Sequence, residues 1–302
     1  MRTGLTLLLL VAAARATAID VEDYSGHTLH LDQPARRVIA LTPQATELSF
    51  AAGAGRSLVG VSRFSGFPPA ARELPVIGDA TLLERERVLA LAPDLAIAWA
   101  SGSDRRALDW LASREIPVLR IETRRLDDIP ATLRAIGALT GHAATAARNA
   151  AGLKQRIGRL RAQSRTRRPV RVFYQVWHRP LMTVSDAHII ADGVAACGGR
   201  NVFADAPGLT PSVSFEAVLA ARPEVIVIAA PGGATELAMA PWSRWFAASG
   251  TQLPVVFVDP DTMHRGSGRM LDAVEQLCGA LGPLAQSADQ AAASRSGNPA
   301  AP

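Results

Sequence analysis

Two cysteines are the residues of this 302-residue chain most capable of covalent chemistry. Cys197 lies beside a Gly-Gly pair in AACGGRNVF, and Cys278 lies in VEQLCGAL. Neither belongs to a C-x-x-C motif of the kind that redox proteins use. They could be unrelated buried thiols, a redox pair or a structural disulfide, and the compartment of the protein helps to choose among these.

The N-terminus has the pattern of a secretory signal peptide. Arg2 supplies a positive charge, and Gly4 to Ala14 form an apolar stretch too short to span a bilayer. Ala16-Thr17-Ala18 then places small residues where a signal peptidase needs them. We predict a signal peptide at residues 1–18, cleaved after Ala18. The alternative is an uncleaved membrane anchor.

Export favours a disulfide between Cys197 and Cys278, because disulfides persist in an oxidising compartment. Closing a loop of about 80 residues would remove on the order of 4 kcal/mol of denatured-state entropy. The alternative is two buried free thiols.

Other signatures of catalysis are missing from the sequence. It contains no G-x-S-x-G, G-x-G-x-x-G, phosphate-binding loop or H-E-x-x-H motif. Its six histidines have no metal-ligand spacing. The adjacent pair Asp127-Asp128 lies at a predicted helix N-terminus, where negative charge is structurally favourable. The residues therefore indicate no catalytic site and no resident cofactor or metal.

The net charge is +5, and nearly all the positive charge is arginine. A basic chain can bind nucleic acid or membranes. Here the densest basic run, Arg156 to Arg171, falls mostly on a predicted helix and has no interleaved aromatic residues. This pattern favours a solvated helix face over a nucleic-acid site.

Strand and helix patterns alternate along the chain. Buried strands are predicted at Val38–Leu41, SLVGVS, PDLAIAWA and PVLRIE, and again after Pro169 at VRVFYQVW, PEVIVIAA and LPVVFVDP. Helical patterns lie between them, one of which begins at Thr42-Pro43 and ends at Gly53. This alternation indicates a parallel α/β architecture.

The alternation is interrupted once, by an Ala- and Arg-rich segment that predicts one long helix. We place this connecting helix at 142–168, between lobes at 19–141 and 169–284, with a disordered tail at 285–302. ERVLALAPDLAIAWA in the first lobe is repeated as EAVLAARPEVIVIAA in the second. The repeat implies two similar lobes with a cleft between them.

This organisation resembles the substrate-binding proteins of type II ABC importers, which carry cobalamin, haem or iron-siderophores to a membrane permease. RVIALTPQATELSFAAGAGRSLVGVS is similar to the family's opening strand-helix-strand, and ERVLALAPDLAIAW to its repeated segment. The resemblance covers residues 36–283. It implies the class III periplasmic binding protein fold, in which a long backbone helix joins two Rossmann-like lobes that hardly move.

Four further segments resemble the BtuF-type cobalamin-binding proteins: VSRFSGFPPAA, VFYQVWHRPLMTVS, ACGGRNVFADAP and PSVSFEAVLA. The resemblance implies a monomeric periplasmic protein that captures cobalamin between its lobes and delivers it to an inner-membrane ABC permease and its ATPase. It also implies a disulfide between the helix before Gly-Gly and the last helix, where Cys197 and Cys278 lie.

Four aromatic residues are candidates for the walls of such a site, because each follows a predicted strand: Phe64, Phe67, Trp99 and Trp177. A corrin ring is a flat, mostly apolar disc fringed with amides, which aromatic rings and a few hydrogen-bonding groups suit. Loops at strand carboxyl ends are where open α/β sheets bind ligands.

The resemblance also implies a ligand loop in the second lobe, within DPDTMHRGSGR. The residues expected to face the ligand are Asp261, Thr262, Met263, His264 and Arg265. The family usually has bulkier aromatic residues in place of Thr262 and Met263. Arg265 is expected to hydrogen-bond corrin amides or the nucleotide-loop phosphate.

Members of this family dock to the permease through one acidic residue on each lobe. Glu216 matches that position in the second lobe. In the first lobe the equivalent position is interpreted as Arg105, so either Asp104 serves instead or docking is asymmetric.

Two other functions are weighed against cobalamin transport. A haem carrier would offer a Tyr or His ligand, for which Tyr174 and His264 are the candidates, and a siderophore carrier would have a basic cleft. An exported enzyme would need a nucleophile–base pair in the cleft, and the sequence provides no signature of one.

Overall fold

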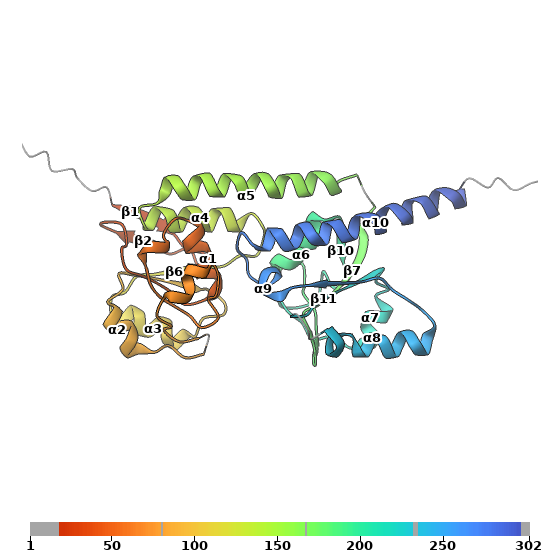
Figure 1. The fold of residues 1–302 in the computed structure, drawn as a ribbon, viewed down its shortest axis with the longest axis horizontal. Coiled ribbons are helices and arrows are strands. Elements are labelled where there is room, and N and C mark those ends of the chain that lie inside the picture. The colour runs from red at the N-terminus through yellow and green to blue at the C-terminus, as the bar shows by residue number, and fades with distance from the viewer. Residues whose placement is uncertain (1–17, 80, 167, 232–234, 297–302) are drawn as a thin grey trace, which may run out of the picture.

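The computed structural model describes residues 18–79, 81–166, 168–231 and 235–296 of the chain. Figure 1 shows two lobes side by side, with helices α5 (Ala143–Ser164) and α10 (Met270–Ser296) along the edge that joins them. The predicted signal peptide falls, except for Ala18, outside the described residues. Within the described part, no helix combines the length and hydropathy that crossing a membrane requires.

The N-terminal lobe contains a four-stranded parallel sheet in the order β4-β3-β5-β6. Its strands are β3 (Val38–Ala40), β4 (Leu58–Val61), β5 (Leu95–Trp99) and β6 (Val118–Ile121). Every residue of β3 is buried, as is every residue of β5 before Trp99. Such continuous hydrophobic runs are typical of parallel strands covered on both faces.

Helices and a short antiparallel pair complete this lobe. They are β1 (Ile19–Glu22), β2 (Thr28–Leu31), α1 (Pro43–Ala51), η1 (Gly55–Ser57), η2 (Pro69–Glu73), α2 (Arg85–Leu91), α3 (Arg105–Ser113) and α4 (Asp128–Leu139). Helix α1 begins as the sequence predicts, because the Thr42 hydroxyl accepts a hydrogen bond from the Ala45 amide. It ends before Gly53, whose φ of 93° suits glycine.

The C-terminal lobe repeats the architecture, with parallel strands in the order β10-β7-β11-β12. Its strands are β7 (Val170–Gln175), β10 (Gly199–Asn201), β11 (Val225–Ala229) and β12 (Val255–Val258), and β8 (Trp177–His178) pairs with β9 (Leu181–Met182). Its helices are α6 (Ile189–Ala196), α7 (Phe215–Ala220), α8 (Thr235–Ser249) and α9 (Pro260–Met263). The predicted fold of two similar α/β lobes is confirmed.

One buried hydrophobic cluster extends through both lobes and the long helices. It includes Leu48 of α1, Leu133 of α4, Ile157 of α5, Val172 of β7 and Val274 of α10. Helix α5 packs along α4 and also contacts α6 and α10. Because the lobes share this core, their separation is set by packing rather than by a flexible linker.

The end of the chain differs from the sequence prediction. We predicted a disordered tail from residue 285, but α10 continues to Ser296, and Ala285 itself is buried. The run from Ala285 is rich in alanine, which has the highest helix propensity, so it extends a helix that packing has already formed. Residues 297–302 lie outside the described residues.

Candidate functional site

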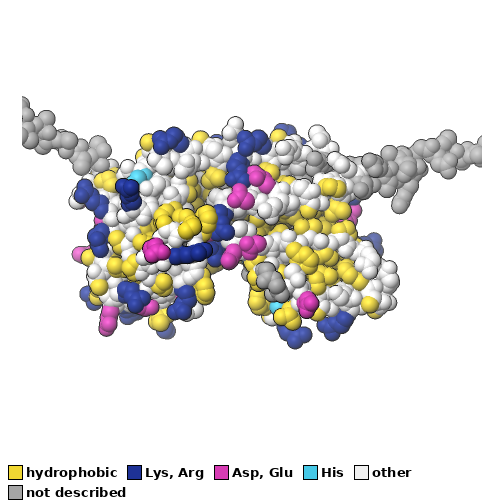
Figure 2. Space-filling model, in the orientation of Figure 1, with side chains coloured by type: hydrophobic (Ala, Val, Ile, Leu, Met, Phe, Trp, Pro, Cys, Tyr) yellow, Lys and Arg dark blue, Asp and Glu magenta, His cyan; other side chains and the backbone are white. Residues whose placement is uncertain are grey.

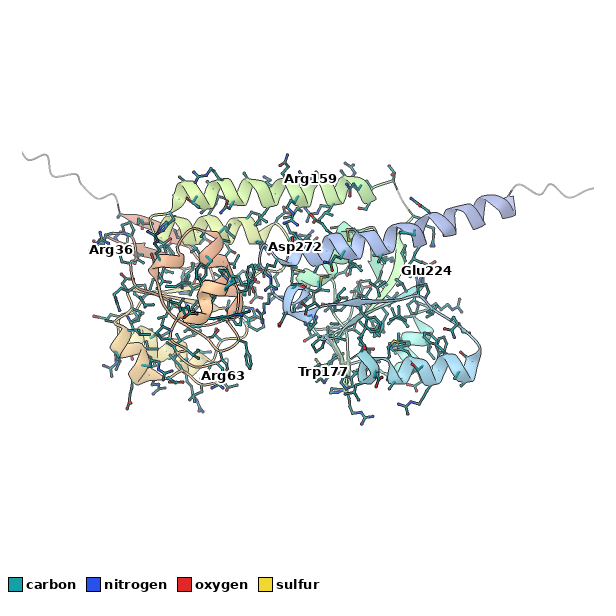
Figure 3. The ribbon with its side chains drawn as sticks, viewed as in Figure 1. Arg36, Arg63, Arg159, Trp177, Glu224 and Asp272 are labelled. Atoms are coloured by element: carbon teal, nitrogen blue, oxygen red, sulfur yellow. A yellow bond between two sulfur atoms is a disulfide. The ribbon has the colours of Figure 1, made fainter. Side chains whose placement is uncertain are left out.

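A cleft separates the two lobes on the side away from α5. Figure 2 shows it as a notch that opens at the bottom of the view. Figure 3 labels Arg63 and Trp177 on opposite sides of this gap. Arg63 follows β4 and Trp177 follows β7, so strand carboxyl ends from both sheets border the cleft, as open α/β sheets arrange their ligand sites.

The four aromatic residues predicted from the sequence are all partly or largely exposed, although their rings are apolar. The exposed fractions are 75% for Phe64, 41% for Phe67, 38% for Trp99 and 52% for Trp177. Phe64 also has a φ of 66°, a left-handed conformation that a bulky residue adopts at a cost. Exposed aromatic rings and backbone strain are both typical of ligand sites.

Trp99 is held in place by its neighbours. Its indole Nε1–H donates a hydrogen bond to Glu122 Oε1 (3.0 Å), and its amide donates to the Ser103 hydroxyl. Its ring also borders a small hollow at the ends of β3 and β4, where Thr42 and Ser62 lie. The buried Glu122 was not predicted from the sequence, because nothing in the local pattern marks it as a partner of Trp99.

The predicted ligand loop differs in part from the expectation. Met263 is fully buried in the shared core, and its methyl group lies close to Gly193 of α6. The prediction that Met263 faces the ligand is therefore wrong. Helix α9 is a single turn, and its last residue points inward because α6 and α10 pack against it. Asp261 is exposed, and Thr262 donates its hydroxyl hydrogen bond to the Asp259 carbonyl.

Arg265 belongs to a network that joins the lobes. Its guanidinium pairs with Asp261 and with Glu47 of α1, at 3.0 and 3.2 Å. The buried Glu47 also accepts hydrogen bonds from Ser267 and Arg269. One carboxylate of the N-terminal lobe therefore holds three side chains that follow α9. Sequence reasoning missed Glu47, which stands inside an otherwise ordinary helical pattern.

Two more contacts cross the same junction. Gln44 donates one hydrogen bond across it, to the Gly266 carbonyl, and a second within its own lobe, to the Thr123 hydroxyl. A Cβ at Gly266 would lie only 2.1 Å from the Thr123 oxygen, so only glycine allows this close approach. The second contact joins Arg269 to Phe67: the guanidinium lies 4.2 Å from the centre of the ring, as a cation–π contact.

Two partly buried histidines lie in the C-terminal lobe near its junction with the N-terminal lobe. His264 Nε2 lies within hydrogen-bonding distance of the Tyr174 hydroxyl, at 3.0 Å. Burial, with a smaller contribution from His188, lowers the pKa of His264 to about 4. Burial, with a smaller contribution from Arg124, lowers the pKa of His188 to about 4. Both imidazoles are therefore neutral at neutral pH.

The haem ligands considered above are poorly placed. Tyr174 is almost fully buried, and burial raises the pKa of its hydroxyl well above the usual value. His264 already pairs with Tyr174 through Nε2. Among the described residues, no group of three or more His, Cys, Asp or Glu side chains is arranged to hold a metal ion.

The predicted docking residues differ in their surroundings. Glu216 is exposed in the first turn of α7, and hydrogen bonds from its own amide and from Ser214 lower its pKa. Asp104 instead caps α3 by accepting a hydrogen bond from the Arg106 amide. The sequence repeat aligns Glu216 with Glu86, which is exposed in the first turn of α2. Helices α2 and α7 both lie in the lower part of Figure 1, one in each lobe.

The predicted pairing of Cys197 with Cys278 is confirmed as a disulfide between the end of α6 and α10. It borders a groove between α5 and α10. This groove lies on the α5 side of the molecule, away from the mouth of the cleft (Figure 1).

Comparisons with known proteins agree with this architecture. The family model described as periplasmic binding protein matches residues 38–240. A vitamin B12-binding protein of Pectobacterium carotovorum subsp. carotovorum is 37% identical over 258 residues, which cover 85% of this chain and 92% of that protein. A vitamin B12-binding protein of Vibrio cholerae serotype O1 is 36% identical over 250 residues, which cover 81% of this chain and 88% of that protein.

Solved structures agree at the level of the fold. The periplasmic vitamin B12 binding protein BtuF of Vibrio cholerae has a TM-score of 0.74 at 35% identity, covering 84% of this chain and 98% of that chain. The periplasmic haem-binding protein HutB of Vibrio cholerae has a TM-score of 0.69 at 21% identity, covering 81% and 98%. The second likeness concerns the fold alone.

Proposed function

The chain belongs to the periplasmic binding protein family, and from this premise we propose that it captures cobalamin in its inter-lobe cleft and delivers it to an ABC importer. The observation that carries the proposal is the exposure of four aromatic residues at or after the ends of β4, β5 and β7, namely Phe64, Phe67, Trp99 and Trp177, in a chain 35–37% identical to vitamin B12-binding proteins. Its role is to bind and carry a ligand, as substrate-binding proteins of importers do.

The chemistry of the cleft suits a corrin. Large aromatic rings offer flat apolar surface, which matches the faces of the macrocycle. Asp261 and Arg265 add polar groups of both signs, which match the amides at its edge. Because Arg265 is paired with Glu47 and Asp261, its guanidinium is already oriented before a ligand arrives. We assign Thr262 and His264 supporting roles in the same loop.

Export and assembly follow from the same proposal. We propose that the signal peptide is removed after Ala18 and that the mature protein acts as a monomer in the periplasm. The shared core keeps the lobes at a fixed distance, so the bound ligand reaches the permease in a cleft of nearly constant shape.

Docking to the permease is assigned to one glutamate on each lobe. Glu216 keeps the role expected from its sequence, and Glu86 replaces Asp104 as its counterpart. Both glutamates are exposed in the first turns of repeated helices, α7 and α2, whereas Asp104 is engaged as a helix cap. Charged residues so placed steer the approach of a partner of opposite charge.

Ligand titration tests the proposed function. We expect the oxidised mature chain to bind cyanocobalamin 1:1 with a dissociation constant of about micromolar or lower, measured by calorimetry and tryptophan fluorescence. Trp99→Ala should cost about 2 kcal/mol, or roughly 30-fold in that constant, because it removes an aromatic wall.

Haemin and a ferric siderophore, titrated in parallel, serve as the competing ligands. Trp110→Phe is the matched control, because Trp110 lies on α3 against Arg85 and Arg114 rather than in a loop at the cleft. Binding of haemin without binding of cobalamin would overturn the ligand assignment while leaving the fold intact.

Uptake in cells tests the docking residues. In the bacterium that encodes the protein, we expect Glu86→Ala with Glu216→Ala to lower cobalamin uptake by about tenfold, because two steering charges are lost. The affinity of the purified variant for cobalamin should be unchanged.

Asp104→Ala and Glu275→Ala are the comparison variants. Glu275 is a partly exposed carboxylate of α10 that pairs with Arg156 of α5, the helix along the edge that joins the lobes. Normal uptake with the double glutamate variant, or a defect with Asp104→Ala alone, would contradict the assignment of Glu86.

A further inference from the structure

Trp99 lies at the end of β5, and the strand itself does not fix the direction of the Trp99 indole ring. Trp99 is the last residue of the strand and is 38% exposed. A side chain in this position normally samples several rotamers, and binding a ligand then carries the entropic cost of selecting one. The surroundings of Trp99 remove this freedom.

Glu122 provides the main contact. This residue directly follows β6, the neighbour of β5 in the sheet, and its carboxylate is almost fully buried. Oε1 accepts the hydrogen bond from Trp99 Nε1 at 3.0 Å, and Oε2 accepts one from the Ser101 amide at 3.1 Å. The same carboxylate therefore ties down both the indole and the loop that follows it.

Gly102 supplies a second constraint. An added Cβ at Gly102 would lie 1.9 Å from Trp99 Cε3 and 2.0 Å from Cζ3, so the backbone of this loop touches the face of the ring. The ring lies between the carboxylate at its edge and the glycine at its face. Only a residue without a side chain permits this stacking.

Arg124 makes the burial of the carboxylate tolerable. Its Nε lies 3.5 Å from Glu122 Oε1, and its guanidinium also lies over the Tyr24 ring. A buried carboxylate needs such a charge and such donors, because desolvation alone would favour its neutral form. Glu122 therefore fixes the indole of Trp99 and the following loop together, with the Ser101 amide and Arg124 as its other partners.

We propose that Glu122 is the positioning residue of the ligand site: it holds the Trp99 indole, through Nε1 and against Gly102, as a preorganised wall of the cleft. The inference rests on the proposed function, and it assigns Glu122 no contact with the ligand. It predicts that the loss of Glu122 lowers affinity by mobilising Trp99.

The first test uses the ligand-free protein. The chain has five tryptophans, so a ¹⁵N–¹H spectrum contains five indole signals, and Trp99→Phe identifies that of Trp99. We expect this indole proton to be protected from solvent exchange in the wild type, to lose its protection in Glu122→Ala, and to keep it in Glu122→Gln, whose amide oxygen still accepts the bond. Protection that persists in Glu122→Ala overturns the proposal.

The second test measures binding of cyanocobalamin. If the competent rotamer falls to about a tenth of the population in Glu122→Ala, the apparent affinity falls about tenfold, while Glu122→Gln stays within about threefold of the wild type. In the Trp99→Phe background, which lacks the indole N–H, Glu122→Ala should have little further effect. Unchanged affinity in Glu122→Ala, or an equal loss in both backgrounds, also overturns the proposal.

Two further variants separate positioning from folding. Glu224→Ala is the matched control, because Glu224 accepts a hydrogen bond from the Arg171 amide and pairs with Arg168 but lies at the far side of the C-terminal lobe (Figure 3). It should leave both the Trp99 signal and the affinity unchanged.

If Glu122→Ala does not fold, Gly102→Ala replaces it. Gly102→Ala should shift the Trp99 signal and weaken cobalamin binding, and a normal signal with normal binding refutes the proposal. A wild type that shows the protected indole but binds no cobalamin refutes the proposed function instead.

Discussion

Glu47→Ala is expected to lower the free energy of unfolding by about 3 kcal/mol, because it removes the carboxylate that holds Arg265 and Arg269 together at the lobe junction. Glu47 is buried, and both arginine side chains are mostly shielded from water. Without Glu47, two cations and the Ser267 hydroxyl lose their shared partner. Urea denaturation, followed by circular dichroism, measures the change.

The same substitution should also weaken cobalamin binding. Glu47 orients Arg265 of the proposed ligand loop and Arg269, which lies over Phe67. A single carboxylate thus supports candidate ligand contacts in both lobes, so its loss should increase the dissociation constant in calorimetry.

Asp272→Ala is the control for this prediction. Asp272 shares Arg156 with Glu275 on the exposed side of α10, so its loss should cost less than about 1 kcal/mol. If Glu47→Ala is no less stable than Asp272→Ala, the junction is held by packing alone and the network contributes nothing measurable.

Removing the disulfide, with Cys197→Ala and Cys278→Ala together, is expected to cost about 4 kcal/mol of stability. The two cysteines are separated by 81 residues in sequence, so the bond closes a large loop in the unfolded chain. Calorimetric and urea unfolding of the double variant check the value. Cobalamin affinity should be unchanged, because the bond lies beside the groove of α5 and α10 rather than at the cleft.

Reduction offers an independent comparison for the disulfide. Wild-type protein treated with a reductant should approach the stability of the double variant, while the double variant itself should not respond. A double variant as stable as the oxidised wild type would mean that packing of α6 on α10 already constrains these ends.

Several features of the site could be predicted from short stretches of sequence. The hydrophobic runs of β4, β5 and β7 are each followed by a loop, and in a parallel sheet such loops gather at one edge. This is why Trp99, Phe64 and Trp177 could be recognised as candidates before any tertiary contact was known. Glu86 is encoded in the sequence too, because the internal repeat aligns it with Glu216.

The proposed ligand loop marks where such reasoning fails. In a one-turn helix such as α9, neighbouring residues point in very different directions, and no periodicity is long enough to show which one is buried. Met263 points inward because α6 and α10 pack around it, and its methyl group lies near Gly193 of α6. Arg265 pairs with a residue 218 positions earlier in the chain, which no local pattern encodes.

By itself, then, the sequence determined the alternation of strands and helices, the two lobes, the long connecting helix and the aromatic residues at the strand ends, because each follows from local periodicity and composition. Only the tertiary structure decided which polar group meets which: Glu47 with Arg265 and Arg269, and Glu122 with Trp99. The physical reason is that a buried charge is tolerated only where donors converge on it, and these donors come from separate segments of the folded chain.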